Sequence, residues 1–244
     1  MKGAPDLEFA AEVARFIKSD HHEVIVTAED LYSSLPEVIY HLESFDALQV
    51  RSSIINYFVA KRAADYVSDV FSGEGGDELF AGYEYLKVIP QELLSDELIN
   101  ITKNLHNTAL QRVDRSASAH GITAHTVFTN PEVVKFAFTI PVELKIYNNV
   151  EKWILREVMK NSLPDQILKR PRIKFWEGAG VNDLISGYAD KHITDNDFRQ
   201  ERRLYNNWLI NTKEELYFYK IFKDHFGPDL RLSWMGRTKG SPVE

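Results

Sequence analysis

The stretch "DVFSGEGGDELFAGYEY", Asp69 to Tyr85, joins a β-branched and aromatic run to a loop rich in glycine and acid. Three glycines and three carboxylates stand between Gly73 and Glu78. Glycine leaves the backbone bare and tolerates positive φ, and acids suit the positive end of a helix. These residues therefore fit an ordinary strand-to-helix turn. They also fit a nucleotide site, in which Glu74 and Asp77 offer hard oxygen ligands to Mg²⁺ on phosphates.

Composition limits what the loop can belong to. The chain has 244 residues, of which 44% are hydrophobic and 27% charged, as in a globular domain with one sizeable core. A net charge of −7 argues against a nucleic-acid partner, and no apolar run has the length of a membrane span. The sequence lacks a secretory signal and contains no cysteine, which favours a reducing, cytoplasmic location and excludes cysteine nucleophiles and thiolate metal sites.

The residues before the loop alternate between helical and strand patterns. The periodicity predicts helices over 5–18, 29–42 and 51–66, and strands over 23–28 and 67–72. Strands separated by helices are typical of a parallel sheet, and such sheets bind ligands outside the carboxyl ends of their strands. The acidic loop follows the second strand, so it is expected at that edge.

From residue 91 onward the pattern is almost entirely helical. Apolar spacing predicts helices over 92–119, 131–138, 149–160, 181–191 and 212–225. The last residues lack a clear period and carry Gly, Pro and Ser, as in an irregular or mobile extension. We therefore expect an α/β part over 1–90, a helical part over 91–226 and an irregular tail over 227–244.

The loop motif also carries a family resemblance. "SGEGGDELFAGY" closely resembles the "SGEGxDExFxGY" signature of the synthetase domain of glutamine-dependent asparagine synthetases. The resemblance runs almost end to end. It includes "GAPDLEFAAEVA" near the start, "EKWILREVMKNSLPDQILKRPRIKF" in the middle and "TKEELYFYKIFKDHFG" near the end. The implied fold is an incomplete parallel-sheet domain of the ATP-pyrophosphatase type, similar to adenine nucleotide alpha hydrolases, followed by a largely helical part.

The resemblance implies a two-step ligase reaction. ATP adenylates the side-chain carboxylate of aspartate to give β-aspartyl-AMP and pyrophosphate, with Mg²⁺, and ammonia then displaces AMP to form the amide. The residues in register with the family pattern receive these roles: Lys152 and Glu74 as catalytic residues, Ser72, Gly73 and Tyr83 at the nucleotide, Asp77 on Mg²⁺, and Arg51 and Lys174 on the substrate. By pattern alone, Lys152 is otherwise an ordinary solvated helix charge.

Several positions depart from the family pattern. Arg172 stands where lysine is usual, and Leu48 and Gln49 replace threonines, which puts the identity of the carboxylate substrate in doubt. In "GITAHTVFTN" the chain has Thr123 for a glutamate and His125 for an arginine, so an ion pair is lost. The same stretch has Val127 for a proline and Asn130 for an aspartate.

The larger departure is a missing motif. The family binds ATP phosphates through an "SGGxDSS" loop, and this sequence contains no such loop. The family's glutaminase half uses a cysteine nucleophile, which is absent as well. Without the phosphate-loop strand and its neighbour, strands 23–28 and 67–72 are expected to flank a gap with unpaired edges. Burying an unpaired backbone group there costs roughly 1–3 kcal/mol.

Three hypotheses follow from the resemblance. The first is an asparagine synthetase part that needs a second chain or upstream fragment carrying the phosphate loop and the glutaminase; a homodimer stays open. The second is a non-catalytic remnant or interaction module. The third is a related ATP-dependent amide former acting on another carboxylate.

Overall fold

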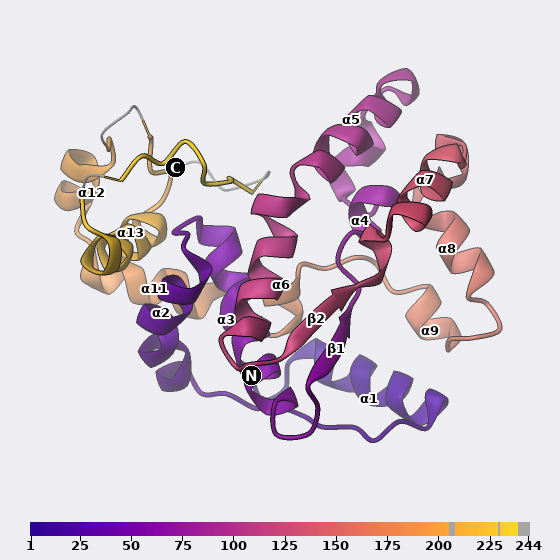
Figure 1. Ribbon diagram of the computed structural model, residues 1–244, viewed down its shortest axis with the longest axis horizontal. Coiled ribbons are helices and arrows are strands. Elements are labelled where there is room, and N and C mark those ends of the chain that lie inside the picture. Colours follow the sequence, from indigo (N-terminus) through magenta and orange to yellow (C-terminus); the bar gives the residue numbers. More distant parts are fainter. Residues whose placement is uncertain (205–207, 229, 239–244) are drawn as a thin grey trace.

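The computed structural model describes residues 1–204, 208–228 and 230–238 of an α/β protein (Figure 1). Its α-helices in chain order are α1 (Pro5–Ile17), α2 (Ala28–Leu42), α3 (Ala47–Ala63), α4 (Gly76–Leu79), α5 (Gln91–Lys103), α6 (Ala109–Ser118), α7 (Pro131–Thr139), α8 (Trp153–Val158), α9 (Asp165–Leu168), α10 (Phe175–Gly178), α11 (Asn182–His192), α12 (Asp195–Glu201) and α13 (Lys213–Phe226). The 3₁₀ turns are η1 (Glu84–Val88), η2 (Leu105–Asn107), η3 (Val127–Thr129) and η4 (Val142–Leu144). The fold class is therefore the predicted one, a small parallel sheet with a largely helical remainder.

The parallel sheet has two strands within the described residues. β1 (Asp69–Ser72) pairs with β2 (Thr123–Thr126), with Asp69 opposite Thr123 and Ser72 opposite Thr126. β1 confirms the strand predicted before the acidic loop. β2 was not predicted, because Thr-Ala-His-Thr lacks the run of apolar or β-branched residues that marks a buried strand. A second sheet is the antiparallel hairpin of β3 (Ile146–Tyr147) and β4 (Val150–Glu151).

The strand predicted over 23–28 is wrong. Residues 21–27 have no regular secondary structure, and Ala28 already belongs to α2. The helix begins there because Thr27 caps it, accepting from the Asp30 amide at 3.1 Å while the Asp30 side chain accepts from the Thr27 amide. A strand also needs a neighbour for its backbone groups, and no described strand pairs with this segment.

The main hydrophobic core lies among α2, α3, α11 and α13, on one side of the molecule (Figure 1). Helix α3 runs through it and buries even polar side chains such as Gln49 and Ser52. Phe45 and Phe218 are both fully buried in this core. Leu232 and Met235, from the segment after α13, also pack into this core.

Smaller clusters support the region around α4. One joins Ala81 and Leu86 to α5, and another packs Leu79 and Phe80 against α7. By contrast, Phe71 on β1 is 83% exposed. The acidic loop between β1 and α4 is therefore packed against α5 and α7 on its carboxyl side and follows an exposed strand on its amino side.

The tail was predicted as an irregular or mobile extension over 227–244. The described residues 227, 228 and 230–238 contain neither helix nor strand, but Leu232 and Met235 are buried in the main core. Residues 239–244 lie outside the described part of the chain.

None of the helices within the described residues combines the length and the hydrophobicity that a membrane span requires.

Candidate active site

The site begins where β1 ends. Gly75 caps α4 with φ 96°, a conformation that glycine adopts without strain, and the side chain of Phe128 packs against Gly75 and Gly76. Gly73 is exposed, and a Cβ built on it would meet nothing within 4 Å. The loop therefore presents bare backbone to its open side while α4 turns its acids inward.

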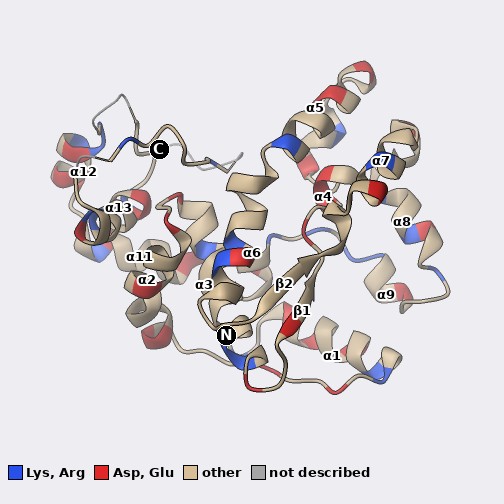
Figure 2. Ribbon diagram, viewed as in Figure 1, with Lys and Arg blue, Asp and Glu red and all other residues tan. Residues whose placement is uncertain are grey.

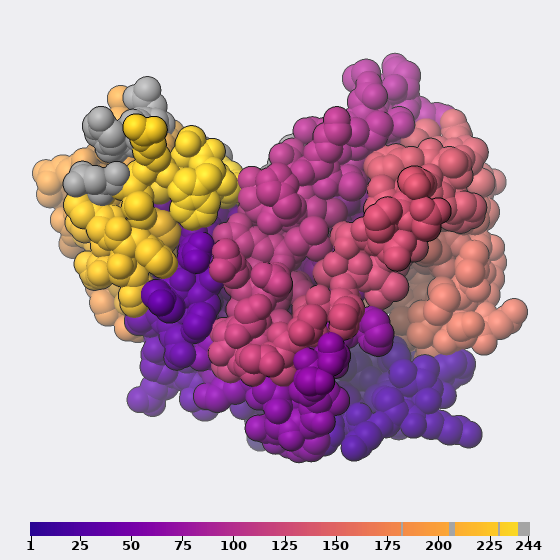
Figure 3. Space-filling view, viewed as in Figure 1, coloured from indigo at the N-terminus to yellow at the C-terminus, as the bar shows by residue number. Residues whose placement is uncertain are grey.

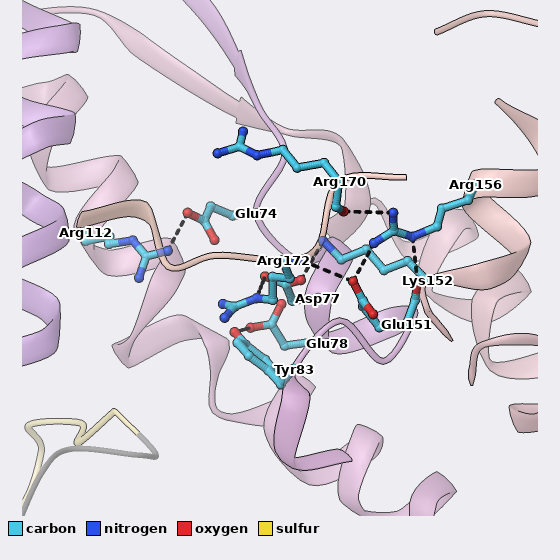
Figure 4. Close-up of polar contacts among 10 residues, drawn as sticks. All are labelled: Glu74, Asp77, Glu78, Tyr83, Arg112, Glu151, Lys152, Arg156, Arg170 and Arg172. Atoms are coloured by element: carbon cyan, nitrogen blue, oxygen red, sulfur yellow. Dashed lines mark hydrogen bonds and ion pairs between the residues drawn. The ribbon is translucent and has the colours of Figure 1, made fainter. Parts of the chain in front are cut away.

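Asp77 is the centre of the charged cluster (Figure 4). Its Oδ1 lies 2.6 Å from Lys152 Nζ, and its Oδ2 lies 3.3 Å from Arg172 Nε. Burial would raise the pKa of Asp77, but the charges of Lys152 and Arg172 outweigh it and hold the pKa below its ordinary value. Asp77 is therefore ionised at neutral pH, flanked by cations from two other segments.

Gly82 makes room for this pair. A Cβ on Gly82 would lie 1.9 Å from Asp77 Oδ1 and 2.3 Å from Lys152 Cε. The amide of Gly82 also donates to the Asp77 carbonyl at 2.8 Å. The glycine in "FAGY" is thus required by the close approach of the ion pair.

A hairpin delivers Lys152 to the cluster. Asn148 and Asn149, both at positive φ, form the two-residue turn between β3 and β4, and Lys152 itself has φ 52° just before α8. Asparagine tolerates this conformation better than most residues. By pattern alone Lys152 was an ordinary solvated helix charge, and by resemblance it was the predicted catalytic lysine; the hairpin turns its ammonium onto Asp77.

Glu151, the last residue of β4, anchors the hairpin through several polar contacts. Its side chain is buried and accepts from Lys87 at 3.0 Å, from Arg156 and, at 3.3 Å, from the Arg172 amide. Arg156 also donates to the Arg170 carbonyl at 3.0 Å. One buried carboxylate thus sets the positions of both Lys152 and Arg172. No motif in the sequence indicated this network.

Acidic and basic segments meet at this point of the fold (Figure 2). The basic coil after α9 also reaches the amino-terminal motif, where Arg170 pairs with Asp6 and lies 4.0 Å over the ring of Phe9. The Asp6 carboxylate packs on Gly178, leaving no space for a Cβ there. Segments far apart in the sequence are therefore joined by a few specific contacts.

Glu74 and Ser72 lie on the open side of α4. Glu74 pairs with Arg112 of α6 at 2.5 Å, and its amide donates to Ser72 Oγ at 3.4 Å. Arg112 was not predicted, since it lies in a helical segment without a distinctive motif. The pair turns the Glu74 carboxylate toward Arg112 and away from Asp77 (Figure 4).

Glu78 is almost fully buried and accepts a short hydrogen bond from the Tyr83 hydroxyl. Burial raises the pKa of Glu78 above its ordinary value, against the hydrogen bond from Tyr83. Burial also raises the pKa of Tyr83, and the charge of Glu78 adds to it. The guanidinium of Arg172 lies 4.6 Å from the centre of the Tyr83 ring, so the tyrosine joins the two parts of the site.

A cavity of about 330 Å³ lies beside these residues. It is lined by Glu78, Tyr83, Tyr85, Ile101, Asn104, Asn107, Thr108, Ala109, Arg112, Gly236, Arg237 and Thr238. Two buried lining atoms, Glu78 Oε2 and Arg112 Nε, have no hydrogen-bond partner among the described residues. A larger, more open hollow of about 530 Å³ lies along α1 and includes none of the predicted site residues.

The two residues assigned to the substrate lie elsewhere. Arg51 is buried in α3 and donates to Glu214 of α13, with Nε 2.8 Å from Oε1. Lys174 has a half-exposed side chain 3.9 Å from Glu177 and 5.3 Å over the ring of Trp176. Neither residue lines the cavity, and their roles stay predictions.

The departures from the family pattern have local consequences. His125 Nε2 lies 2.9 Å from Asp69 Oδ1, so the histidine has an acidic partner across the two strands. Asn130 caps α7 by accepting from the Glu132 amide at 2.9 Å. Both residues lie next to the acidic loop and support the strand and helix that flank it.

A Mg²⁺ site was expected at Asp77. No group of three or more metal-binding side chains occurs in the described ranges, so an all-protein cage is not formed there. Mg²⁺ is usually held by one or two carboxylates together with substrate phosphates and water. An ionised Asp77 can supply one such carboxylate.

Comparison with known proteins identifies the family of the chain. The profile of the asparagine synthase family matches residues 1–94 and 90–226. The chain belongs to the asparagine synthase family. It is 35% identical over 246 residues to a glutamine-hydrolysing asparagine synthetase of Gallus gallus, covering 96% of this chain and 44% of that protein.

Other relatives show the same coverage. A glutamine-hydrolysing asparagine synthetase of Sandersonia aurantiaca is 32% identical over 97% of this chain and 47% of its own length. A probable asparagine synthetase of Schizosaccharomyces pombe is 34% identical over 100% of this chain and 47% of its own length. The chain thus spans about half the length of the relatives it matches.

Proposed function

We propose that this chain forms the amide of asparagine from aspartate, with β-aspartyl-AMP as the intermediate. The observation that carries the proposal is the Asp77–Lys152–Arg172 cluster at the carboxyl end of β1. In an α/β protein this edge of the sheet is where nucleotides bind. The two cations there suit a phosphate that gains negative charge.

Lys152 is the proposed stabiliser of the reacting α-phosphate. The aspartate side-chain oxygen forms a bond to the α-phosphorus as the bond to the pyrophosphate oxygen breaks. Ammonia then attacks the acyl carbon, AMP leaves, and the nitrogen loses a proton. A preorganised ammonium held by Asp77 lowers the barrier because the protein has already oriented it.

The open side of the loop suits the nucleotide. Gly73 is exposed and unobstructed, and Ser72 and Glu74 stand beside it. With Mg²⁺ bound, Asp77 would hold the ion, which neutralises charge on the pyrophosphate oxygens. Tyr83 would close the pocket from the far side of Asp77.

The cavity supports an amino-acid substrate. An α-amino acid brings an ammonium group that can donate to Glu78 Oε2 and a carboxylate that can accept from Arg112 Nε, the two unpartnered buried atoms. The amide and hydroxyl groups of Asn104, Asn107 and Thr108 offer further polar contacts. Aspartate is small enough for such a cavity.

The phosphate loop belongs, in this proposal, to polypeptide beyond these 244 residues, in the same or a second chain. The edge of β1 opposite β2 has no strand beside it in the described residues, and residues 23–27 are unpaired as well. Polypeptide bearing the phosphate loop and its strands would fill that place. A glutaminase supplying ammonia, a homodimer and a cytoplasmic location are further parts of the proposal.

The substrate assignment is tested by carboxylate-dependent ATP–pyrophosphate exchange. The chain is mixed with the phosphate-loop segment of an asparagine synthetase, and aspartate, glutamate and asparagine are compared. We expect exchange with aspartate alone. Exchange with glutamate instead would assign another carboxylate, and nucleotide binding without any exchange would identify a non-catalytic member of the family.

A further inference from the structure

The two cations that contact Asp77 come from short segments with little secondary structure of their own. Lys152 follows the two-residue strand β4, and Arg172 lies in the coil over residues 170–174, between α9 and α10. Figure 3 shows α8 and α9 (salmon), which precede this coil, between α7 above and α1 (indigo) below. A coil without a strand beside it needs partners for its backbone groups.

Arg156 of α8 supplies such partners. Its Nη1 donates to the Arg170 carbonyl at 3.0 Å and also to the Leu168 carbonyl. Its Nε donates to the Glu151 carbonyl at 2.8 Å, and its Nη2 pairs with the Glu151 carboxylate (Figure 4). One guanidinium therefore joins the end of the hairpin to the basic coil.

Glu151 and Arg156, here called the clamp, hold the coil at two points. The Glu151 carboxylate accepts from the Arg172 amide at 3.3 Å. In the described chain, the Arg170 carbonyl and the Arg172 amide are the backbone groups of residues 170–173 that bond to a segment other than α9 or α10. The side chains of Arg156 and Glu151 are 19% and 6% exposed, so this pair is shielded from water, unlike a surface ion pair.

Such a connection needs an arginine. The planar guanidinium presents its donors as a rigid fork and can serve acceptors on two sides, whereas a lysine ammonium is a compact point charge. We propose that Arg156 is a positioning residue: it fixes the hairpin relative to the coil, so that Lys152 and Arg172 both reach Asp77. Arg156 acts through these two cations, and its own donors are directed at protein groups.

This inference rests on the proposed function and concerns the same site. Lys152 and Arg172 should lose their alignment together when Arg156 is shortened, which slows the step at the α-phosphate. The cavity proposed for the amino-acid part of the substrate is lined by neither of these cations nor by Arg156. The affinity for aspartate should therefore change little while the rate falls.

Hydrogen exchange of the Arg172 amide in the full chain, followed by NMR, tests the clamp itself. Arg156→Lys keeps the charge but loses the fork, and Arg156→Met loses both. We expect the Arg172 amide to exchange about tenfold faster in each variant, since the clamp no longer holds the coil. The control is Arg115→Lys, because Arg115 is partly exposed and pairs with Glu43 at the surface.

Thermal unfolding of each variant is measured in parallel, and Arg156→Lys decides the outcome if Arg156→Met does not fold. An Arg172 amide that exchanges as slowly in the Arg156 variants as in the control would overturn the positioning role.

Aspartate-dependent ATP–pyrophosphate exchange with the phosphate-loop segment tests the consequence for catalysis. Arg156→Lys should lower the maximum rate by about 10- to 100-fold, because the groups at the phosphate are displaced, and leave the half-saturating aspartate concentration unchanged. In an Arg172→Met background the same change should have a much smaller effect, because one of the cations that Arg156 positions is already gone.

A full effect of Arg156→Lys in the Arg172→Met background, or a loss confined to aspartate affinity, would overturn the positioning role and leave the proposed function intact. A wild-type chain that shows no exchange with any amount of the segment would refute the proposed function, and the positioning role with it.

Discussion

The two sides of the molecule are packed very differently. Among α2, α3, α11 and α13, large side chains such as Phe45 and Phe218 are fully buried. Around the parallel sheet, Phe71 is 83% exposed and Val127 is 53% exposed, and residues 23–27 have no strand beside them. In the proposed function, the polypeptide that carries the phosphate loop covers this surface. The loop of the candidate site, residues 73–78, lies on the border between the two regions.

The largest expected effect concerns the helical core. Phe218→Ala should lower the free energy of unfolding by about 3–5 kcal/mol, because it removes a fully buried ring and leaves a cavity. Urea denaturation followed by circular dichroism measures this. A loss below about 1 kcal/mol would show that the core does not carry the stability of the chain.

The next effect concerns catalysis, and it tests the role of Lys152 in the candidate site between the two regions. Lys152→Ala should lower aspartate-dependent exchange by about 10²–10³-fold, the usual result of removing one preorganised charge from a transition state. Lys135, an exposed lysine of α7 paired with Glu132, provides the matched control as Lys135→Ala. Equal rates in the two variants would remove Lys152 from the site.

A buried lysine gives a pH-dependent effect of intermediate size. Lys145 is 1% exposed, and burial lowers its pKa to about 8 from an ordinary value of 10.5. A lysine whose pKa is lower in the folded state destabilises the fold at every pH below its folded pKa. The free energy of unfolding of the wild type therefore rises as the pH increases from the folded pKa of about 8 to the ordinary pKa of 10.5. Lys145→Met should therefore stabilise the chain at neutral pH by roughly 1–3 kcal/mol.

The difference between Lys145→Met and wild type should shrink across the same pH window. Urea denaturation at several pH values measures it, and other titrating groups cancel because both proteins contain them. A difference that does not change with pH would show that Lys145 keeps its proton in the folded state.

The smallest effect is expected at the sheet. Phe71→Ser should change the free energy of unfolding of the chain alone by less than about 0.5 kcal/mol, because the ring is already in water. The same variant should bind the phosphate-loop segment more weakly, as measured by calorimetry. Strong destabilisation of the isolated chain would mean that Phe71 is already covered.

The sequence predicted the elements that carry their own signal. Helices α1 and α2 follow from apolar spacing, and β1 follows from a β-branched run before glycines. β2 was missed because its partner, not its composition, makes it a strand. The strand predicted over 23–28 was wrong for the converse reason. Its composition is typical of a strand, but no described strand lies beside it to pair with its backbone.

The site divides in the same way. The motif placed Asp77 and Lys152 as candidates, and the structure brings them to 2.6 Å. Nothing in the pattern indicated Arg112, Glu151 or Arg156, because their roles arise from side chains that meet only after folding. Ion pairs between distant segments leave no periodic pattern of residues along the sequence.

The most direct test of the central claim is aspartate-dependent ATP–pyrophosphate exchange by this chain as the phosphate-loop segment is titrated in. The account predicts almost no exchange without the segment and a rate that rises until the segment and the chain are equimolar. Full exchange by the chain alone, or none at any amount of segment, would contradict it.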